Sequence, residues 1–169
     1  MATTTNVPVE VYLRSSYEPD AEYVDGRIEE RPMGEFDHSS WQDAIQAWFR
    51  QNVKDWNLRA RPELRVRVSA TRYRVPDVTV LDRAQPVEQI ITIPPVAVFE
   101  VLSPEDRLPR LKVKLEDYRA MGIQEIWVID PRDSSYFRYQ DRQLTRRDTF
   151  SHAARGIHFE MNEIKKLID

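Results

Sequence analysis

The 169-residue chain is long enough for one domain with a buried core, and we expect that domain to span residues 1–169. A hydrophobic content of 41% excludes a disordered chain, and a net charge of −3 means that nucleic-acid binding would need a local basic patch. The absence of cysteine excludes disulfides, thiolate metal sites and cysteine nucleophiles, and it suits a cytoplasmic protein. No apolar run approaches the roughly 20 residues of a membrane span, so we expect no membrane association.

The first half of the chain predicts helices, a hairpin and two strands. In order, these are a helix over 8–16, a hairpin over 20–32, a helix over 37–55, and strands over 57–69 and 73–81. The hairpin is predicted from the pair Asp25-Gly26, which favours a tight turn between two extended runs. The long helix is predicted from Trp41, Ile45 and Phe49, which fall on one helical face.

The second half predicts a buried strand–helix–strand unit. In order, we expect a loop over 82–95, a strand over 96–102, a helix over 105–121, a strand over 124–130, a hairpin over 135–140 and 143–150, and a short helix or strand over 160–168. The runs VAVFEVL and QEIWVID are nearly continuous in apolar residues, which is typical of strands buried on both faces. Joined by a helix, two such strands predict a right-handed parallel crossover in a mixed sheet, within an α/β or α+β fold.

Glu100 and Asp77 are the candidate residues for chemistry. Glu100 interrupts the apolar run VAVFEVL, where a lone carboxylate is costly unless it is paired, protonated or bound to a metal. Asp77 follows Pro76, which blocks a ladder hydrogen bond and marks an irregular point in its strand. If the two strands pair, the carboxylates meet at one end of the sheet, where a divalent cation such as Mg²⁺ would relieve their repulsion. Each residue alone also fits an ordinary structural role.

Lys114 is a third candidate, on the helix that follows Glu100. Its spacing from Leu111 and Leu115 puts it beside the apolar stripe of that helix. A lysine that leans toward the strand end could orient a water molecule or hold a phosphate. Spacing alone favours the other interpretation, a solvated lysine on a charged helix.

Four stretches combine into a specific pattern. They are VPDVTVL (75–81), PVAVFEVLSP (95–104), KLEDY (114–118) and GIQEIWVIDP (122–131). Together they resemble the Uma-type restriction endonuclease family of the PD-(D/E)XK nuclease superfamily. The resemblance extends from about Tyr23 to about Tyr139. It implies a restriction-endonuclease-like central mixed β-sheet flanked by helices.

The resemblance also implies a set of site residues. Asp77 and Glu100 correspond to metal ligands, with the backbone carbonyl of Val101 as a third. The superfamily's lysine stands two residues after the second acid, where this chain has Leu102. The Uma-type pattern carries its lysine on the following helix, and Lys114 matches that position.

Three earlier residues fall where the family has acids and a histidine: Glu22, Glu30 and His38. An acid near the first helix often completes the superfamily's site, and we expect Glu30 to take that role. His38 belongs to the site or caps its helix, and both interpretations stay open.

Arginines form the basic clusters of the sequence. One cluster comprises Arg59, Arg61, Arg65, Arg67, Arg72 and Arg74, with only Glu63 opposing, and a second comprises Arg107, Arg110, Lys112, Lys114 and Arg119. Arginine suits phosphate contacts, so these residues are candidates for nucleic-acid binding. A solvated strand face explains the first cluster equally well.

The leading hypothesis is a Mg²⁺- or Mn²⁺-dependent endonuclease that acts on nucleic acid, DNA in the first instance, with a homodimer as one arrangement for cutting two strands. A second hypothesis is a non-catalytic binding or assembly module with a nuclease fold. It is favoured by Leu102 and by Arg110, which replaces an aspartate common in the family. A hydrolase using Ser103 or His38 ranks below both, because the sequence lacks a nucleophile elbow.

Overall fold

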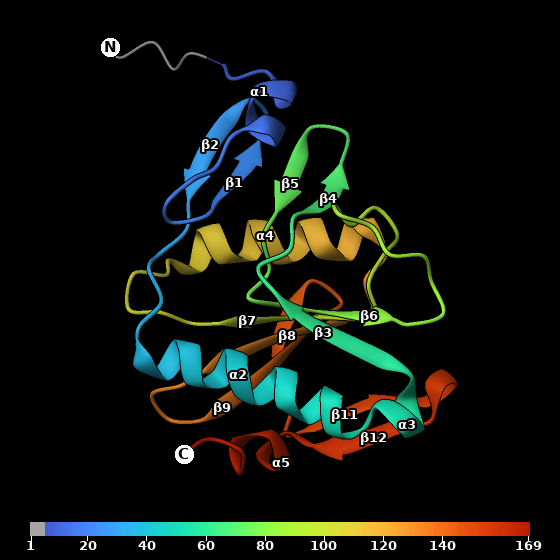
Figure 1. The fold of residues 1–169 in the computed structure, drawn as a ribbon. Coiled ribbons are helices and arrows are strands. Elements are labelled where there is room, and N and C mark those ends of the chain that lie inside the picture. The colour runs from blue at the N-terminus through green and yellow to red at the C-terminus, as the bar shows by residue number, and fades with distance from the viewer. Residues whose placement is uncertain (1–5) are drawn as a thin grey trace.

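The computed structural model describes residues 6–169 and stacks its elements in layers. A small sheet lies over helix α4, α4 lies on one face of a larger sheet, and helix α2 lies on the other face (Figure 1). The helices are α1 (Val9–Arg14), α2 (Phe36–Gln51), α3 (Val53–Trp56), α4 (Leu108–Met121) and α5 (Met161–Lys165). Within residues 6–169, no helix has both the length and the apolar character needed to cross a membrane.

The larger sheet has six strands in the order β10-β9-β8-β7-β6-β3. Their bounds are β3 (Leu58–Pro62), β6 (Val78–Asp82), β7 (Ala97–Val101), β8 (Glu125–Asp130), β9 (Ser135–Gln140) and β10 (Gln143–Arg146). Strands β7 and β8 are parallel and are joined through α4, whereas the other neighbours are antiparallel. The predicted mixed sheet flanked by helices, with a parallel strand–helix–strand unit at its centre, is confirmed.

The smaller sheet has four strands in the order β2-β1-β5-β4. Their bounds are β1 (Ala21–Val24), β2 (Arg27–Glu30), β4 (Val66–Ser69) and β5 (Arg72–Arg74). Asp25 and Gly26 both have positive φ, at 51° and 89°, as expected for the tight turn of the predicted hairpin. Tyr12 of α1 packs against Tyr23 and Tyr73 of this sheet.

Alternation along β7 decides which side chains meet which helix. Phe99 and Val101 face α2 in the larger hydrophobic core. Val98 faces the opposite way, into the core beneath α4 that contains Leu115. Glu100 lies two residues from Val98 and therefore points toward α4 as well, at the end of the buried strand.

Two predicted strands are each divided between the two sheets, which corrects the expectation of one strand over 57–69 and one over 73–81. The first separates into β3 and β4, because Glu63 adopts a left-handed backbone with φ 54° that ends the extended run. The second separates into β5 and β6 around Val75 and Pro76, since proline cannot donate a ladder hydrogen bond. The chain thus leaves the larger sheet after β3 and returns to it at Asp77.

Three other boundaries differ from prediction. The helix over 37–55 breaks at Asn52, whose side-chain amide donates to the carbonyl of Trp48 at 2.9 Å and ends α2. The helix over 105–121 starts at Leu108, with Pro109 in its first turn. The region after β10 leaves the larger sheet and forms β11 (Thr149–His152), η1 (Ala153–Arg155) and β12 (Ile157–Glu160), with β11 and β12 paired, before α5.

Candidate active site

Glu100 meets two side chains of α4. The Nζ atom of Lys114 lies 3.1 Å from Glu100 Oε1, and the hydroxyl of Tyr118 donates a 2.6 Å hydrogen bond to the same oxygen. Lys114 and Tyr118 are four residues apart, so they share one face of the helix. Only 5% of Glu100 is exposed, and the helix therefore supplies the polar partners that this buried carboxylate needs.

Glu22 of β1 is the second acid at Lys114. Its Oε2 atom lies 3.1 Å from Lys114 Nζ and accepts a 2.7 Å hydrogen bond from the backbone amide of Val75. Its Oε1 atom lies 3.6 Å from the guanidinium of Arg74, a residue that is only 2% exposed. Lys114 therefore joins the smaller sheet, through Glu22, to the larger sheet, through Glu100.

Asp77 lies where the chain returns to the larger sheet. Its Oδ2 atom accepts a 2.7 Å hydrogen bond from the backbone amide of Val101, which holds the carboxylate over the end of β7 next to Glu100. Its Oδ1 atom forms an ion pair with Arg31 and lies 3.2 Å from Nε2 of His38, at the start of α2. Two basic groups therefore cover the side of Asp77 that does not face β7.

The protonation of the cluster follows from burial and from its neighbours. Burial raises the pKa of Glu100 to about 8, and the carboxylates of Asp77 and Glu22 add to this effect against the ammonium of Lys114. Burial also opposes ionisation of Asp77, but His38 and Arg31 outweigh it and lower the pKa of that carboxyl to about 2. Burial disfavours a charged Lys114, yet Glu100 and Glu22 raise its pKa above the usual value. Near neutral pH, Lys114 is an ammonium and Asp77 a carboxylate.

His38 lies at the site and not only at the start of its helix. Burial lowers the pKa of its imidazole, but the hydrogen bond with Asp77 outweighs burial and raises the pKa above 6.5. Its Nδ1 atom is buried and has no hydrogen-bond partner among residues 6–169. Together with Arg31, which also lies 3.6 Å from Glu63, it keeps positive charge beside Asp77.

The structure brings together most of the residues singled out from the sequence, and Glu30 lies at the wall of the same cavity as Glu100 and Lys114. Asp77, Glu100 and Lys114 converge, with the backbone of Val101 between the first two. Glu30 is exposed at the end of β2, and its carboxylate has no hydrogen bond or ion pair in the described part of the chain. Glu22 is the early acid that contacts Lys114.

Two further contacts at the site were not anticipated: the ion pair of Arg31 and the hydrogen bond of Tyr118. Tyr118 carries a sequence signal, because it lies one helical turn after Lys114. Arg31 carries none, since its contact with Asp77 spans 46 residues.

The two positions that depart from the family pattern have structural roles. Leu102 packs at the edge of the core beneath α4. Arg110 lies 3.4 Å from Glu29 and donates to the carbonyl of Glu30 at 3.2 Å, which ties the start of α4 to the smaller sheet.

The donor chemistry of the site fits a magnesium or manganese ion. Asp77 and Glu100 offer buried carboxylate oxygens, which these cations prefer, and burial raises the pKa of Glu100, an effect that a bound cation would offset by favouring the ionised carboxylate. Among the described residues, no group of three or more aspartate, glutamate or histidine side chains is arranged to hold a metal ion by itself. The remaining ligand positions would fall to water, to substrate oxygens or to a backbone carbonyl, as is usual for magnesium.

Solved structures resemble the chain over most of its length. A putative nuclease belonging to DUF820 from Anabaena variabilis is 22% identical, with a TM-score of 0.80, and the match covers 95% of this chain and 98% of that one. That likeness shows the shared fold. A DrdV–DNA complex is 17% identical over 75% of this chain and 11% of that one, and its TM-score of 0.41 is too low to carry an argument.

No curated protein matches the chain. A family model does match, and it covers residues 9–157, which include every residue of the site described above. The chain therefore belongs to the Uma2 family, whose description is "Putative restriction endonuclease".

Proposed function

We propose that the protein is a metal-dependent endonuclease that hydrolyses phosphodiester bonds in nucleic acid, with Mg²⁺ or Mn²⁺ as cofactor and DNA as the first substrate to test. One observation carries the proposal: the buried ammonium of Lys114 lies between Glu100 and Glu22, 3.1 Å from each, beside the ionised Asp77. Membership of a family described as restriction endonucleases supports the same chemistry.

Asp77 and Glu100 would hold the cation, with the carbonyl of Val101 as a further ligand. When bound, such a cation lowers the pKa of a water molecule and offsets negative charge on the phosphate. Lys114 and Tyr118 both contact Oε1 of Glu100, so Oε2 is the oxygen that would be available to a cation.

Lys114 acts as a cation and not as a base, because its neighbours favour the protonated form. An ammonium can orient an attacking water molecule by hydrogen bonding and can stabilise the charge that develops on the phosphate. Glu22 positions Lys114, since it holds the ammonium from the side opposite Glu100.

Plasmid nicking in Mg²⁺, in Mn²⁺ and in EDTA tests the proposal. We expect cleavage with either metal and none in EDTA, and a loss of at least about 100-fold in Asp77→Asn, Glu100→Gln and Lys114→Met, because each removes charge from the reacting centre. Glu10→Gln is a matched control, since Glu10 is exposed on α1 and lies outside the cavity at Lys114. Full activity in Asp77→Asn or Glu100→Gln would exclude the assignment.

A non-catalytic binding module is the second candidate, and one contact favours it. Arg31 already forms an ion pair with Asp77, which could replace a metal as the counter-charge. Calorimetry with MnCl₂ separates the two: binding that Asp77→Asn abolishes supports the enzyme, and no binding at neutral pH supports the module.

A further inference from the structure

Four arginines gather along strand β3, the outer strand of the larger sheet. Arg59 and Arg61 lie on β3 itself, Arg50 lies in the last turn of α2, and Arg83 follows β6. In the described part of the chain, none of the four is in an ion pair. Four guanidinium groups without a direct carboxylate partner in the described residues therefore border one edge of the molecule, although Asp82 and Glu88 line a neighbouring cavity with Arg59 and Arg61.

Other arginines of the same stretch of sequence make contacts within the fold. Arg72 and Arg74 pair with Asp117 of α4, at 2.8 Å and 2.7 Å. Arg65 donates to the backbone carbonyl of Leu13 at 3.1 Å. Three members of the sequence cluster thus hold the fold together. The other three have no ion pair in the described residues, and two of these, Arg59 and Arg61, lie on β3, whereas Arg67 is exposed on β4.

A groove runs between α2 and β3 beside these arginines. It has a volume of about 290 Å³, and its walls include Arg50, Arg59, Arg61 and Arg83 together with Gln46. Its lining contains no acidic residue. The acids nearest to these arginines in the sequence have other partners: Asp82, directly before Arg83, pairs with Arg155 at 3.0 Å, and Glu63 faces Arg31 at 3.6 Å.

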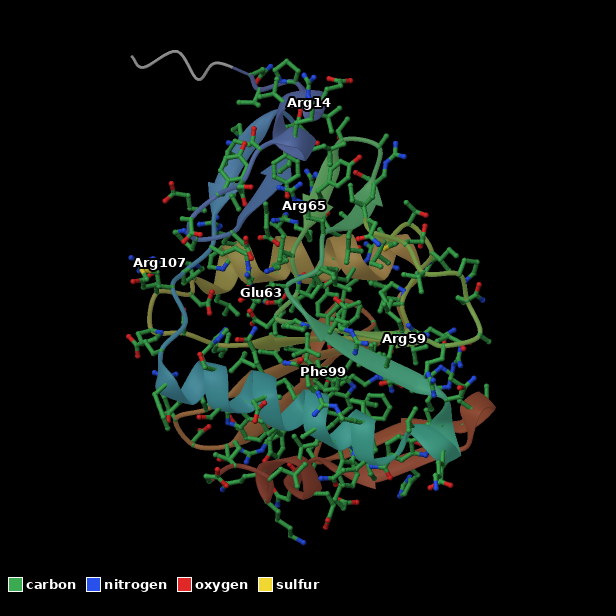
Figure 2. All side chains as sticks on the ribbon, in the orientation of Figure 1. Arg14, Arg59, Glu63, Arg65, Phe99 and Arg107 are labelled. Carbon is green, nitrogen blue, oxygen red and sulfur yellow. The ribbon has the colours of Figure 1, made fainter. Side chains whose placement is uncertain are left out.

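The two arginines of β3, Arg61 and Arg59, lie at increasing distance from the candidate active site. Pro62 pairs with Val78, directly after Asp77, whereas Arg61 pairs with Thr79 and Arg59 with Leu81. Arg59 therefore lies about 7 Å farther along β3 than Arg61. Figure 2 shows Arg59 on β3 and Glu63 just beyond the opposite end of that strand.

We infer that this groove binds the phosphodiester backbone of a nucleic acid. The bound part is the segment of the nucleic acid that extends from the candidate active site. The inference rests on the proposed function, because it assigns the substrate's path to that site. Guanidinium groups bind phosphate oxygens in a bidentate way, and a row of them along an open groove suits a chain of phosphates better than a single small anion. Contacts of this kind fix position without reading sequence, so binding here is independent of sequence and weakened by salt.

Fluorescence anisotropy tests the inference, with a labelled 20-base-pair DNA duplex in EDTA at several salt concentrations. The variant Arg59→Gln/Arg61→Gln should bind at least about tenfold more weakly at low salt, and the slope of log affinity against log salt should fall by about 2. The matched control is Arg146→Gln/Arg147→Gln, because these exposed arginines lie at or just after β10, the opposite edge of the same sheet. The control should bind as the wild-type protein does.

An unchanged affinity and slope in Arg59→Gln/Arg61→Gln would overturn the inference, as would an equal loss in the control or a failure of the wild-type protein to bind the duplex. Circular dichroism of both variants verifies that a loss is not unfolding. Cleavage by the wild-type protein with unchanged binding in the variant rejects the groove and keeps the nuclease. Arginine-dependent binding without cleavage in Mg²⁺ or Mn²⁺ supports the groove and rejects the nuclease.

Discussion

At the scale of single residues, Lys114 and Glu100 depend on each other. The ammonium has two acidic partners at 3.1 Å, and removing it would leave two buried carboxyl groups without their shared cationic neighbour. Glu100 remains poorly compensated even so, since burial raises its pKa to about 8. Ionisation of a buried acid of this kind lowers the free energy of unfolding. Acids with such a raised pKa are common at functional sites.

The substitution Glu100→Gln should therefore stabilise the protein at high pH. The pKa of Glu100 in the folded protein lies above its usual value of 4.5, so its contribution to stability is present below pH 4.5 and is lost as pH rises toward 8. We expect the free energy of unfolding of the variant to exceed that of the wild-type protein by more than about 1 kcal/mol at pH 8, and to match it near pH 4, below the usual pKa. Urea denaturation in EDTA measures the free energy of unfolding of the variant and of the wild-type protein at each pH. Glu10→Gln, at an exposed position on α1, should show no such pH-dependent difference, and a loss of stability in Glu100→Gln at pH 8 would contradict the argument.

Arg31 should weaken metal binding at Asp77, because its guanidinium and a divalent cation compete for the same carboxylate oxygen. Replacing it, in Arg31→Gln, should tighten Mn²⁺ binding several-fold in calorimetry at pH 7.5, where Asp77 stays ionised with or without the arginine. Arg27→Gln, an exposed position on β2, is the control and should leave the affinity unchanged. Weaker binding in Arg31→Gln would mean that the arginine supports the metal site.

At the scale of elements, α4 connects the two sheets. One side of the helix packs on the larger sheet through Leu111, Leu115 and Tyr118. The other connection is Asp117, whose carboxylate accepts a 2.8 Å hydrogen bond from Nε of Arg74, which is buried in the smaller sheet. The position of Glu22 at Lys114 therefore depends on how the smaller sheet is attached to this helix.

The substitution Asp117→Asn should loosen that attachment. Removing one charge leaves Arg74 buried with weaker compensation from Glu22 and Glu29, and we expect a loss of about 2–3 kcal/mol in the free energy of unfolding. Urea denaturation followed by circular dichroism measures the loss. Asp43→Asn, at an exposed position on α2, should cost less than about 0.5 kcal/mol. Equal effects in the two variants would show that Asp117 has no special role.

At the scale of the whole molecule, local patterns predicted the central β7–α4–β8 unit and the hairpin at Asp25-Gly26, because periodicity and turn chemistry depend on neighbouring residues. They did not predict that the runs over 57–69 and 73–81 each serve two sheets, since an alternating pattern suits one strand or two equally well. The outcome depends on the left-handed backbone of Glu63 and on long-range pairing.

The same difference between local patterns and long-range pairing explains which residues of the site could be predicted from the sequence. Asp77, Glu100 and Lys114 were found from a motif. The choice between Glu22 and Glu30 depends on which residue of one hairpin faces α4, and sequence spacing does not fix that face. Arg31 reaches Asp77 only because the chain passes from the smaller sheet toward α2 at that point.

The arginine row on β3 also has a consequence for self-association. The outer strand of a sheet exposes unpaired backbone groups that invite pairing with another chain, and charged side chains are a common protection against it. Two copies that met edge to edge along β3 would bring Arg59 and Arg61 of one against those of the other. Like-charge repulsion therefore disfavours a continuous intermolecular sheet through this strand, and a dimer of this protein would have to form through another face.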